Sequence, residues 1–357
     1  MTKADKIKSF DPSGIGDVNA NLFGLPFTTD EADIVIIQAP WEVTVSYKGG
    51  TADGPKAIYD ASFQVDLYDP LVQNAWMMGI AMDDEEEAIH FKGHTLRLKA
   101  EKYISLYARG FKHTDHPEMA EILSEVNLEC VKMNNSIKTK ALDYFDKGKV
   151  IGLIGGDHST PLGMMQAMAE RFKSYAILQI DAHADLREAY EGFEFSHASI
   201  MYNALKIPQV EKLVQVGIRD YCEAENNIMT GSGSRVKTFF DRDIKQALYN
   251  GEGWNDTCER IIKELPEHVY LSFDIDGLDP RFCPNTGTPV AGGLETEQVM
   301  YLLEKIYKAG KKIIAFDINE IAPGKDEWDA NVGARLLYRI SNLVALSNGR
   351  NPPVNDN

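Results

Sequence analysis

Cysteine is scarce in this sequence, and its four cysteines, at positions 130, 222, 258 and 283, form no CxxC pair. This spacing excludes a disulfide framework and a zinc-knuckle pattern, so we expect ordinary reduced thiols. The chain also lacks a run of eighteen apolar residues, which excludes a membrane-spanning helix. Its first residues, MTKADKIKSFDPSG, contain no apolar signal region, and we therefore expect a cytoplasmic protein.

Positive charge is the second shortage. The chain has 37 Lys and Arg against 54 Asp and Glu, a formal net charge of −17, and no basic patch. This balance disfavours nucleic acid as a partner, whereas an acidic field attracts cationic small molecules. Hydrophobic residues make up 44% of the 357 positions, which is enough for a substantial core.

Short runs rich in Ile, Val and Leu, without strict alternation, predict strands buried on both faces. They span residues 32–39, 150–156, 175–181, 212–218, 268–274 and 312–318. Helical patterns lie between them, at residues 116–148, 160–172, 255–265, 295–309 and 333–347. This alternation predicts an α/β fold of three layers, with a central, mostly parallel sheet between helices.

The pattern also suggests how the chain is divided. Residues 1–30, rich in Gly, Asn, Pro and Asp, are expected to form an N-terminal extension packed on the surface, and residues 31–357 a single domain. The acidic run DDEEE, residues 83–87, is interpreted as a solvated loop or the start of a helix.

Polar side chains gather where four of the predicted strands end. They are Asp157 and His158; Asp181, His183 and Asp185; Asp274 and Asp276; Asp317 and Glu320. The carboxyl ends of parallel strands are where open α/β sheets bind their ligands. We therefore expect about two imidazoles and several carboxylates at one edge of the sheet.

The spacing within these clusters favours metal ions. Asp181, His183 and Asp185 alternate along an extended segment and share one side of it, with their ends about 13 Å apart. That length can bracket two ions ~3.5–4 Å apart, the usual two-metal separation. A single DxH pattern is more often a capping turn, but three such clusters in one chain are not. Asp274 and Asp276 would repel each other without a cation between them, so we interpret them as metal ligands.

Three motifs, GGDHS at 155–159, DAHAD at 181–185 and SFDIDGLDP at 272–280, resemble those of the ureohydrolases, the family of arginase and agmatinase. The resemblance covers about residues 30–345 and implies the α/β/α arginase fold with a binuclear manganese centre. It implies that His158, Asp181, Asp185 and Asp274 bind one ion. The implied ligands of the other ion are Asp181, His183, Asp274 and Asp276. Asp181 and Asp274 would then bridge the two ions, and Asp157 and Asp279 would cap turns or hydrogen bond to the ligands.

The donor set agrees with this metal. Four carboxylates and two imidazoles are an oxygen-rich set, which suits Mn²⁺ better than Zn²⁺ bound by thiolates; Ni²⁺ and Co²⁺ are alternatives. Four aspartates and two divalent ions are neutral together, and a bridging hydroxide leaves one negative charge that favours a cationic substrate. The metals would lower the pKa of the bridging water from 15.7 towards ~7.

The same resemblance implies two further catalytic side chains. His197, in DAHADLREAYEGFEFSHAS, matches a family histidine near the metals and would help to protonate the leaving nitrogen; a structural histidine at a helix start is the alternative. Glu320 matches the glutamate that pairs with the guanidinium, with helix capping as its alternative. Arg187 stands where arginases carry an Asn that binds the amino acid, which argues against α-amino acid recognition.

The loop WEVTVSYKGG, residues 41–50, is expected to line the same edge and to select the substrate. Trp41 and Tyr47 are predicted to stack on a guanidinium or to occupy the space of a long amine tail. Glu42 is predicted instead to bind that tail's ammonium group. The alternative for Trp41 is a side chain packed under the loop.

The sequence therefore predicts a metal-dependent hydrolase of linear amidine C–N bonds that releases urea through a metal-bridging hydroxide, with agmatine-like substrates first. Free guanidine, guanidino acids and formiminoglutamate are alternatives on the same fold, and a catalytically silent metal-binding protein is an alternative of another class. The expected partners are a small cationic guanidino substrate and, by family resemblance, further copies in a homotrimer or homohexamer, with no nucleic acid and no membrane.

Overall fold

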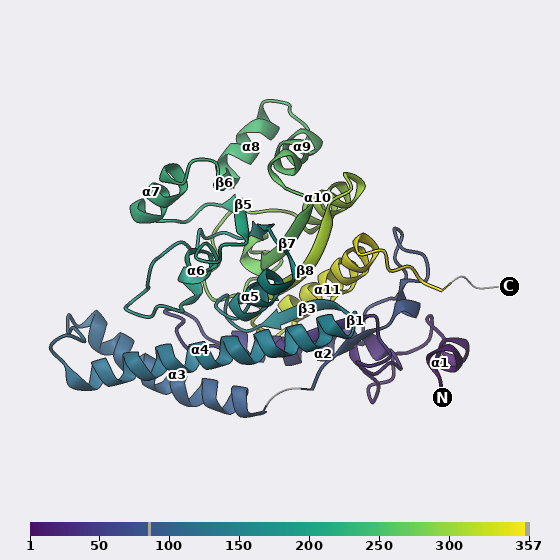
Figure 1. Cartoon of the computed structure of the whole chain (residues 1–357), viewed down its shortest axis with the longest axis horizontal. Helices are drawn as coiled ribbons and strands as arrows, with labels where there is room; N and C mark the ends of the chain where they lie inside the picture. Colours follow the sequence, from purple (N-terminus) through teal and green to yellow (C-terminus); the bar gives the residue numbers. More distant parts are fainter. Residues whose placement is uncertain (85–86, 354–357) are drawn as a thin grey trace.

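The computed structural model describes residues 1–84 and 87–353 and contains one eight-stranded, parallel sheet between two layers of helices (Figure 1). The strands follow the order β2-β1-β3-β8-β7-β4-β5-β6. They are β1 Ile34–Ala39, β2 Ile80–Met82, β3 Val150–Gly155, β4 Tyr175–Ile180, β5 Val210–Ile218, β6 Val236–Phe240, β7 His268–Asp274 and β8 Lys312–Asn319. The predicted three-layer α/β/α fold is confirmed.

The helices divide between the two faces of the sheet. The α-helices are α1 Lys3–Ser9, α2 Gly54–Ser62, α3 Glu87–Ala108, α4 Pro117–Asp146, α5 Leu162–Arg171, α6 Ile200–Ala204, α7 Glu223–Gly231, α8 Asp241–Tyr249, α9 Trp254–Glu264, α10 Thr296–Lys308 and α11 Trp328–Ser347. Short 3-10 turns are η1 Leu22–Gly24, η2 Thr51–Asp53, η3 Ala75–Met78, η4 His197–Ser199 and η5 Ile275–Gly277. One apolar cluster joins the sheet to α2 and to α8 through α11. A second joins its other face to α3 through α7.

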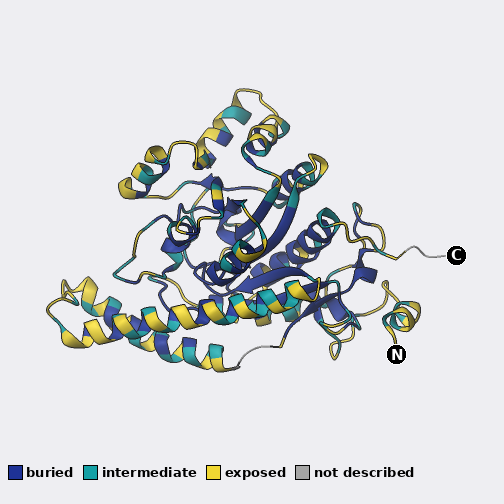
Figure 2. Cartoon of the chain, viewed as in Figure 1, coloured by how far each residue is buried: buried dark blue, intermediate teal, exposed yellow. Residues whose placement is uncertain are grey.

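The central strands are buried on both faces (Figure 2), because each helix layer covers one of them. This burial explains why their sequences are continuous aliphatic runs. The edge strands β2 and β6 were not predicted. β2 has only three residues, and Val236 is the one buried residue of β6. An edge strand with one covered face carries no such run.

Of the long helices α3 and α4, only α4 was predicted. The two helices pack side by side and extend beyond the sheet (Figure 1), with exposed residues along much of their length (Figure 2). Because α3 is covered mainly by α4, its sequence lacks a broad apolar face, and no helix was predicted at residues 87–108. None of the helices within the described ranges is both long and apolar enough to cross a membrane.

Within residues 1–30, Leu22, Phe23, Leu25 and Phe27 are buried in the core cluster. The ring of Phe23 meets that of Tyr338 in α11 edge-on, with their centroids 5.1 Å apart. The division into an extension and one domain stays a prediction. In the DDEEE run, Asp83 contradicts the expected solvated loop, because it is buried and paired with Lys140 at 2.9 Å. Glu87 begins α3, and residues 85–86 lie outside the described residues, as do 354–357.

Candidate metal centre

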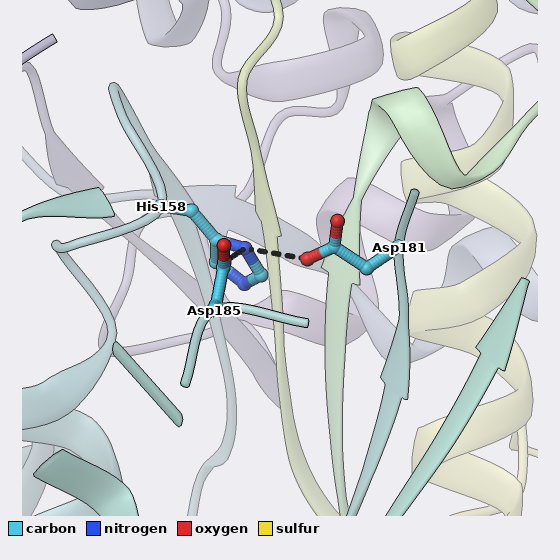
Figure 3. Close-up of side chains that lie close together, drawn as sticks. All are labelled: His158, Asp181 and Asp185. Atoms are coloured by element: carbon cyan, nitrogen blue, oxygen red, sulfur yellow. Dashed lines mark ion pairs between the residues drawn. The ribbon is translucent and has the colours of Figure 1, made fainter. Parts of the chain in front are cut away.

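Three side chains meet at the carboxyl ends of β3 and β4 (Figure 3). The Nδ1 atom of His158 lies 3.0 Å from Oδ2 of Asp181 and 3.0 Å from Oδ2 of Asp185. Asp274, at the end of β7, brings its Oδ2 to 3.2 Å from the same nitrogen. His158, Asp181 and Asp185 can hold one ion, and we call them the inner group.

A second group shares Asp181. The Nδ1 atom of His183 lies 3.0 Å from Oδ2 of Asp276 and 3.7 Å from Oδ1 of Asp181. Asp181, His183 and Asp276 can hold a second ion, and we call them the outer group. Asp181 thus directs one oxygen to each group, as a bridging carboxylate would. Oδ2 of Asp274 reaches the inner group, and its Oδ1 accepts the Asp276 N–H at 2.8 Å; its bridging role stays a prediction.

The hydrogen bonds of Ser272 determine which nitrogen of His158 faces the carboxylates. The Ser272 hydroxyl donates to Oδ1 of Asp317 at 3.0 Å, so its oxygen must accept from Nε2–H of His158, also at 3.0 Å. Nε2 therefore keeps its proton, and Nδ1 is the nitrogen that would offer its lone pair to a metal ion.

The backbone around the site is tightly constrained. Asp185 and Glu320 have φ values of 55° and 64°, in the left-handed region that is rare outside glycine and often occupied at functional sites. Gly156 of GGDHS permits close packing, because an added Cβ would lie 2.1 Å from the carbonyl oxygen of Trp41. At Gly277 an added Cβ would lie 2.6 Å from the backbone nitrogen of Asp181.

These residues fit a pair of cations. Nδ1 of His158 faces three carboxylate oxygens at 3.0–3.2 Å, and the buried atoms His158 Nδ1 and Asp276 Oδ2 lack a hydrogen-bond partner. Burial, followed by the charges of Asp276 and Asp181, raises the pKa of Asp274 well above its usual value. Burial and the charge of Asp181 raise the pKa of Asp185 to about 7. Positive charge would relieve both effects.

A cavity of about 430 Å³ opens above the outer group. Its lining includes His183, Asp185, His197 and Tyr47. His197 begins η4 behind its N-cap Ser196, and its ring meets Tyr190 edge-on at 6.0 Å. Burial, together with the positive charge of His183, lowers the pKa of His197 to about 3, so its ring is neutral at pH 7.

Glu320 follows β8 and is buried beside the inner group. Its Oε1 accepts the backbone N–H of His158 at 2.8 Å, and its own backbone N–H donates to the carbonyl oxygen of Gly156 at 2.8 Å. An added Cβ on Gly287, next to the cavity-lining Thr288, would lie 3.3 Å from Oε2 of Glu320. Burial and the negative charge of Asp157 raise the pKa of Glu320 well above its usual value. A cation beside Glu320 would therefore stabilise its charged carboxylate.

The WEVTVSYKGG loop places its three predicted substrate residues in different environments. Trp41 is 2% exposed and belongs to the core cluster under the loop, whereas Tyr47 is 71% exposed and lines the cavity. One oxygen of Glu42, Oε2, accepts the backbone N–H groups of Gly50 at 2.6 Å and Ala52 at 3.1 Å, as well as that of Thr51. The structure therefore brings only Tyr47 to the cavity, and roles for Trp41 and Glu42 in substrate binding stay predictions.

Three other residues from the sequence analysis lie around the site. Asp157 accepts the N–H groups of Val43 and Ser159, and Asp279 accepts that of Arg281, so both hold turns as expected. Arg187 lines the cavity, with its guanidinium 4.8 Å from the centre of the Tyr190 ring.

Sequence reasoning missed a row of buried polar residues one pleat below the ligands. Gln179 precedes Asp181 by two positions, and Ser272 precedes Asp274 by two, so each points to the same side of its strand as its ligand. The available signal was a polar residue two positions before a ligand in an otherwise aliphatic run.

Comparison with known proteins identifies the family. The model of the Arginase family matches residues 32–341. An N(1)-aminopropylagmatine ureohydrolase of Thermus thermophilus is 28% identical over 320 residues, covering 90% of this chain and 93% of that protein. An agmatinase of Cronobacter sakazakii is 32% identical over 222 residues, covering 61% and 67%.

Solved structures share the fold. The agmatine ureohydrolase of Thermoplasma volcanium aligns with a TM-score of 0.67 at 21% identity, covering 96% of this chain and 97% of that one. The arginase of Bacillus cereus aligns with a TM-score of 0.62 at 21% identity, covering 86% and 98%. With the family model spanning the sheet and every ligand segment, the chain belongs to the Arginase family.

Proposed function

We propose that this protein hydrolyses the guanidinium group of an agmatine-like compound and releases urea, using two Mn²⁺ ions. As a member of the Arginase family the chain is a hydrolase of guanidino compounds. The observation that carries the proposal is the meeting of the inner and outer groups beneath the cavity that His197 lines. Relatives named agmatinase and aminopropylagmatine ureohydrolase favour a substrate with a cationic tail.

The inner and outer groups would hold the two ions, with Asp181 shared between them. Bound there, the ions supply Lewis acidity that makes a water molecule nucleophilic at neutral pH. Because carboxylate oxygens outnumber imidazole nitrogens in both groups, we assign Mn²⁺, with Ni²⁺ and Co²⁺ as alternatives. Reconstitution of the metal-free protein with each metal in turn, followed by urea assay, tests the assignment.

Glu320 and His197 would act on the substrate itself. His158 N–H fixes Oε1 of Glu320, and we assign Oε2 to the guanidinium, whose charge offsets that of the buried carboxylate. His197 lines the cavity, and it would help to protonate the leaving nitrogen, the role that the family resemblance implies.

The decisive experiment is a urea-release assay over agmatine, N(1)-aminopropylagmatine, free guanidine and a guanidino acid. The proposal expects the highest kcat/KM for one of the two amines. If the metal-loaded protein released urea from none of the four, the proposal would fail.

Free guanidine is the second candidate, because Tyr47 and Lys48 of the loop line the cavity. An ammonium tail would meet this aromatic ring and the charge of Lys48, whereas the charge of Arg187 is offset by Glu225, 3.9 Å away. If Tyr47 shortens the cavity, Tyr47→Ala should raise kcat/KM for agmatine relative to guanidine, and Tyr47→Phe, which keeps the ring, should not. Lys48→Gln should act in the same direction by less than ~1 kcal/mol, the usual size for an exposed charge. Unchanged ratios in every variant would remove the loop from substrate selection.

We also propose a homotrimer or homohexamer, as the family resemblance implies, and a cytoplasmic location, which the four free cysteines support. Light scattering on the purified protein tests the assembly. A monomer at working concentration would contradict it.

A further inference from the structure

A row of polar side chains crosses the middle of the sheet below the metal ligands. Thr238 of β6 pairs in register with Gln215 of β5, which pairs with Gln179 of β4. The row continues through Ser272 of β7 to Asp317 of β8. Gln179 and Gln215 are fully buried, on the face where their neighbours Ile177 and Leu213 join the aliphatic core. Two primary amides in such a place cost several kcal/mol unless every polar atom is paired.

The hydrogen bonds of the two amides all lead towards the DAHAD segment. Nε2 of Gln179 donates to Oδ2 of Asp181 at 2.8 Å and to the carbonyl of His183 at 3.1 Å. Nε2 of Gln215 donates to Oε1 of Gln179 at 2.7 Å and to the carbonyl of Ala184 at 2.9 Å. The hydroxyl of Thr238 donates to Oε1 of Gln215 at 2.8 Å and ends the chain.

The direction of this chain is fixed by chemistry. A carboxylate and a backbone carbonyl only accept hydrogen bonds, so Gln179 must present its NH₂ group to Asp181 and His183. Its oxygen then faces Gln215, whose NH₂ group is in turn required by the carbonyl of Ala184. A flipped amide at either position would set oxygen against oxygen, so the row admits one arrangement.

We propose that Gln179, held in this orientation by Gln215, is a positioning residue for the metal centre. It fixes the carboxylate that the inner and outer groups share and, through the carbonyls of His183 and Ala184, the course of the segment that carries His183 and Asp185. The proposal rests on the metal centre of the proposed function and concerns metal affinity, with no contact between Gln179 and substrate.

The test is titration of the chelator-treated protein with Mn²⁺ by calorimetry, with the electron paramagnetic resonance spectrum of bound Mn²⁺ as a second readout. Gln179→Met preserves volume and removes both donors. It should weaken Mn²⁺ binding about 10–100-fold, the usual loss when a partner of a metal ligand is removed. Gln215→Met keeps the hydrogen bond from Gln179 to Asp181 but removes the Gln215 amide that holds Gln179 in its orientation. This variant should also weaken Mn²⁺ binding, by a smaller factor.

Thr238→Val is the matched control, because it deletes a hydrogen bond of the same row without touching Gln179 or the DAHAD segment, and its Kd should equal the parent's. If the row serves only the core, the Met variants would lower the melting temperature of the metal-free protein and leave the Mn²⁺ Kd unchanged, which would overturn the proposal. If Gln179→Met does not fold, a Gln215→Met protein that binds Mn²⁺ with the parent's Kd would also overturn the proposal. A parent protein that binds no Mn²⁺ would refute the proposed metal centre itself.

Discussion

The inner and outer groups share Asp181 but differ in their surroundings. His158 of the inner group is 1% exposed, and Ser272 and Asp317 orient its ring. The side chain of His183 in the outer group is 23% exposed and lines the cavity. Both groups reach the cavity, through Asp185 and His183, but the core encloses the imidazole of the inner group and leaves that of the outer group open. The difference suggests that the inner ion binds more tightly and that the outer ion is the one that exchanges with solvent.

The largest effect should come from the residue that the groups share. Asp181→Asn should abolish binding of both ions and all urea release, because it removes a charge from each group. His183→Ala should empty the outer group, keep one ion in the inner group and lose nearly all activity. Metal content by mass spectrometry, with urea release, measures both. Asp279→Asn, in the SFDIDGLDP motif but outside both groups, is the control and should keep both ions. A His183→Ala protein that binds neither ion would show that the groups are not separable.

His197 tests whether the chemistry occurs on the outer side. Replacing a proton-transferring residue typically costs 10²–10⁴-fold, so we expect a loss of about that size in kcat for His197→Ala. Metal content should stay that of the parent, since His197 belongs to neither group. A variant with parental kcat would leave His197 with a purely structural role at the start of η4.

Metal removal should separate the groups by affinity. Ions bind the folded site alone, so saturation at 100 times the Kd should add roughly 2.7 kcal/mol to the free energy of unfolding per ion. Thermal melts at increasing chelator concentration should show a first loss as the outer ion leaves and a second as the inner ion follows. A single step at one chelator concentration would indicate equal affinities, and an unchanged melting temperature would argue against any bound metal.

The smallest effect concerns pH in the metal-free protein. The pKa of Asp185 rises from 3.8 to about 7 on folding, so the folded state binds the extra proton. Burial opposes the charged form of His158, but its carboxylate partners outweigh burial and raise its pKa, which acts in the same direction. The shift of His197 acts in the opposite direction over the same range, because its pKa falls to about 3 on folding. In a His197→Ala variant, which removes that opposing shift, the stability of the metal-free protein should therefore fall as pH rises from about 4 through 7. With metal bound, the trend should reverse, because the ligands bind ions when deprotonated. Melting temperatures across this range provide the check, and a metal-free variant that gains stability towards pH 7 would contradict it.

The ligands were predictable because their information is local. Within GGDHS, DAHAD and SFDIDGLDP, strand alternation determines which side chains share a side, and the end of an aliphatic run places them at the sheet edge. Six ligand-type residues and the central strands could therefore be assigned without coordinates. The helix α3 could not, because α4 is its main packing partner, and the edge strand β6 could not, because only Val236 in it is buried, so neither carries a distinct pattern.

The loop and the polar row were decided only by tertiary structure. Nothing near Trp41 in the sequence indicates that the core encloses it, and Glu42 caps backbone groups eight to ten residues away. Gln179 and Gln215 are 36 positions apart and meet only because β4 and β5 pair in register. The sequence by itself determined which candidate metal ligands gather at the sheet edge, since that depends on residue type and short spacing. Which side chains hold those atoms in place, and which face the substrate, depends on long-range packing that no short spacing encodes.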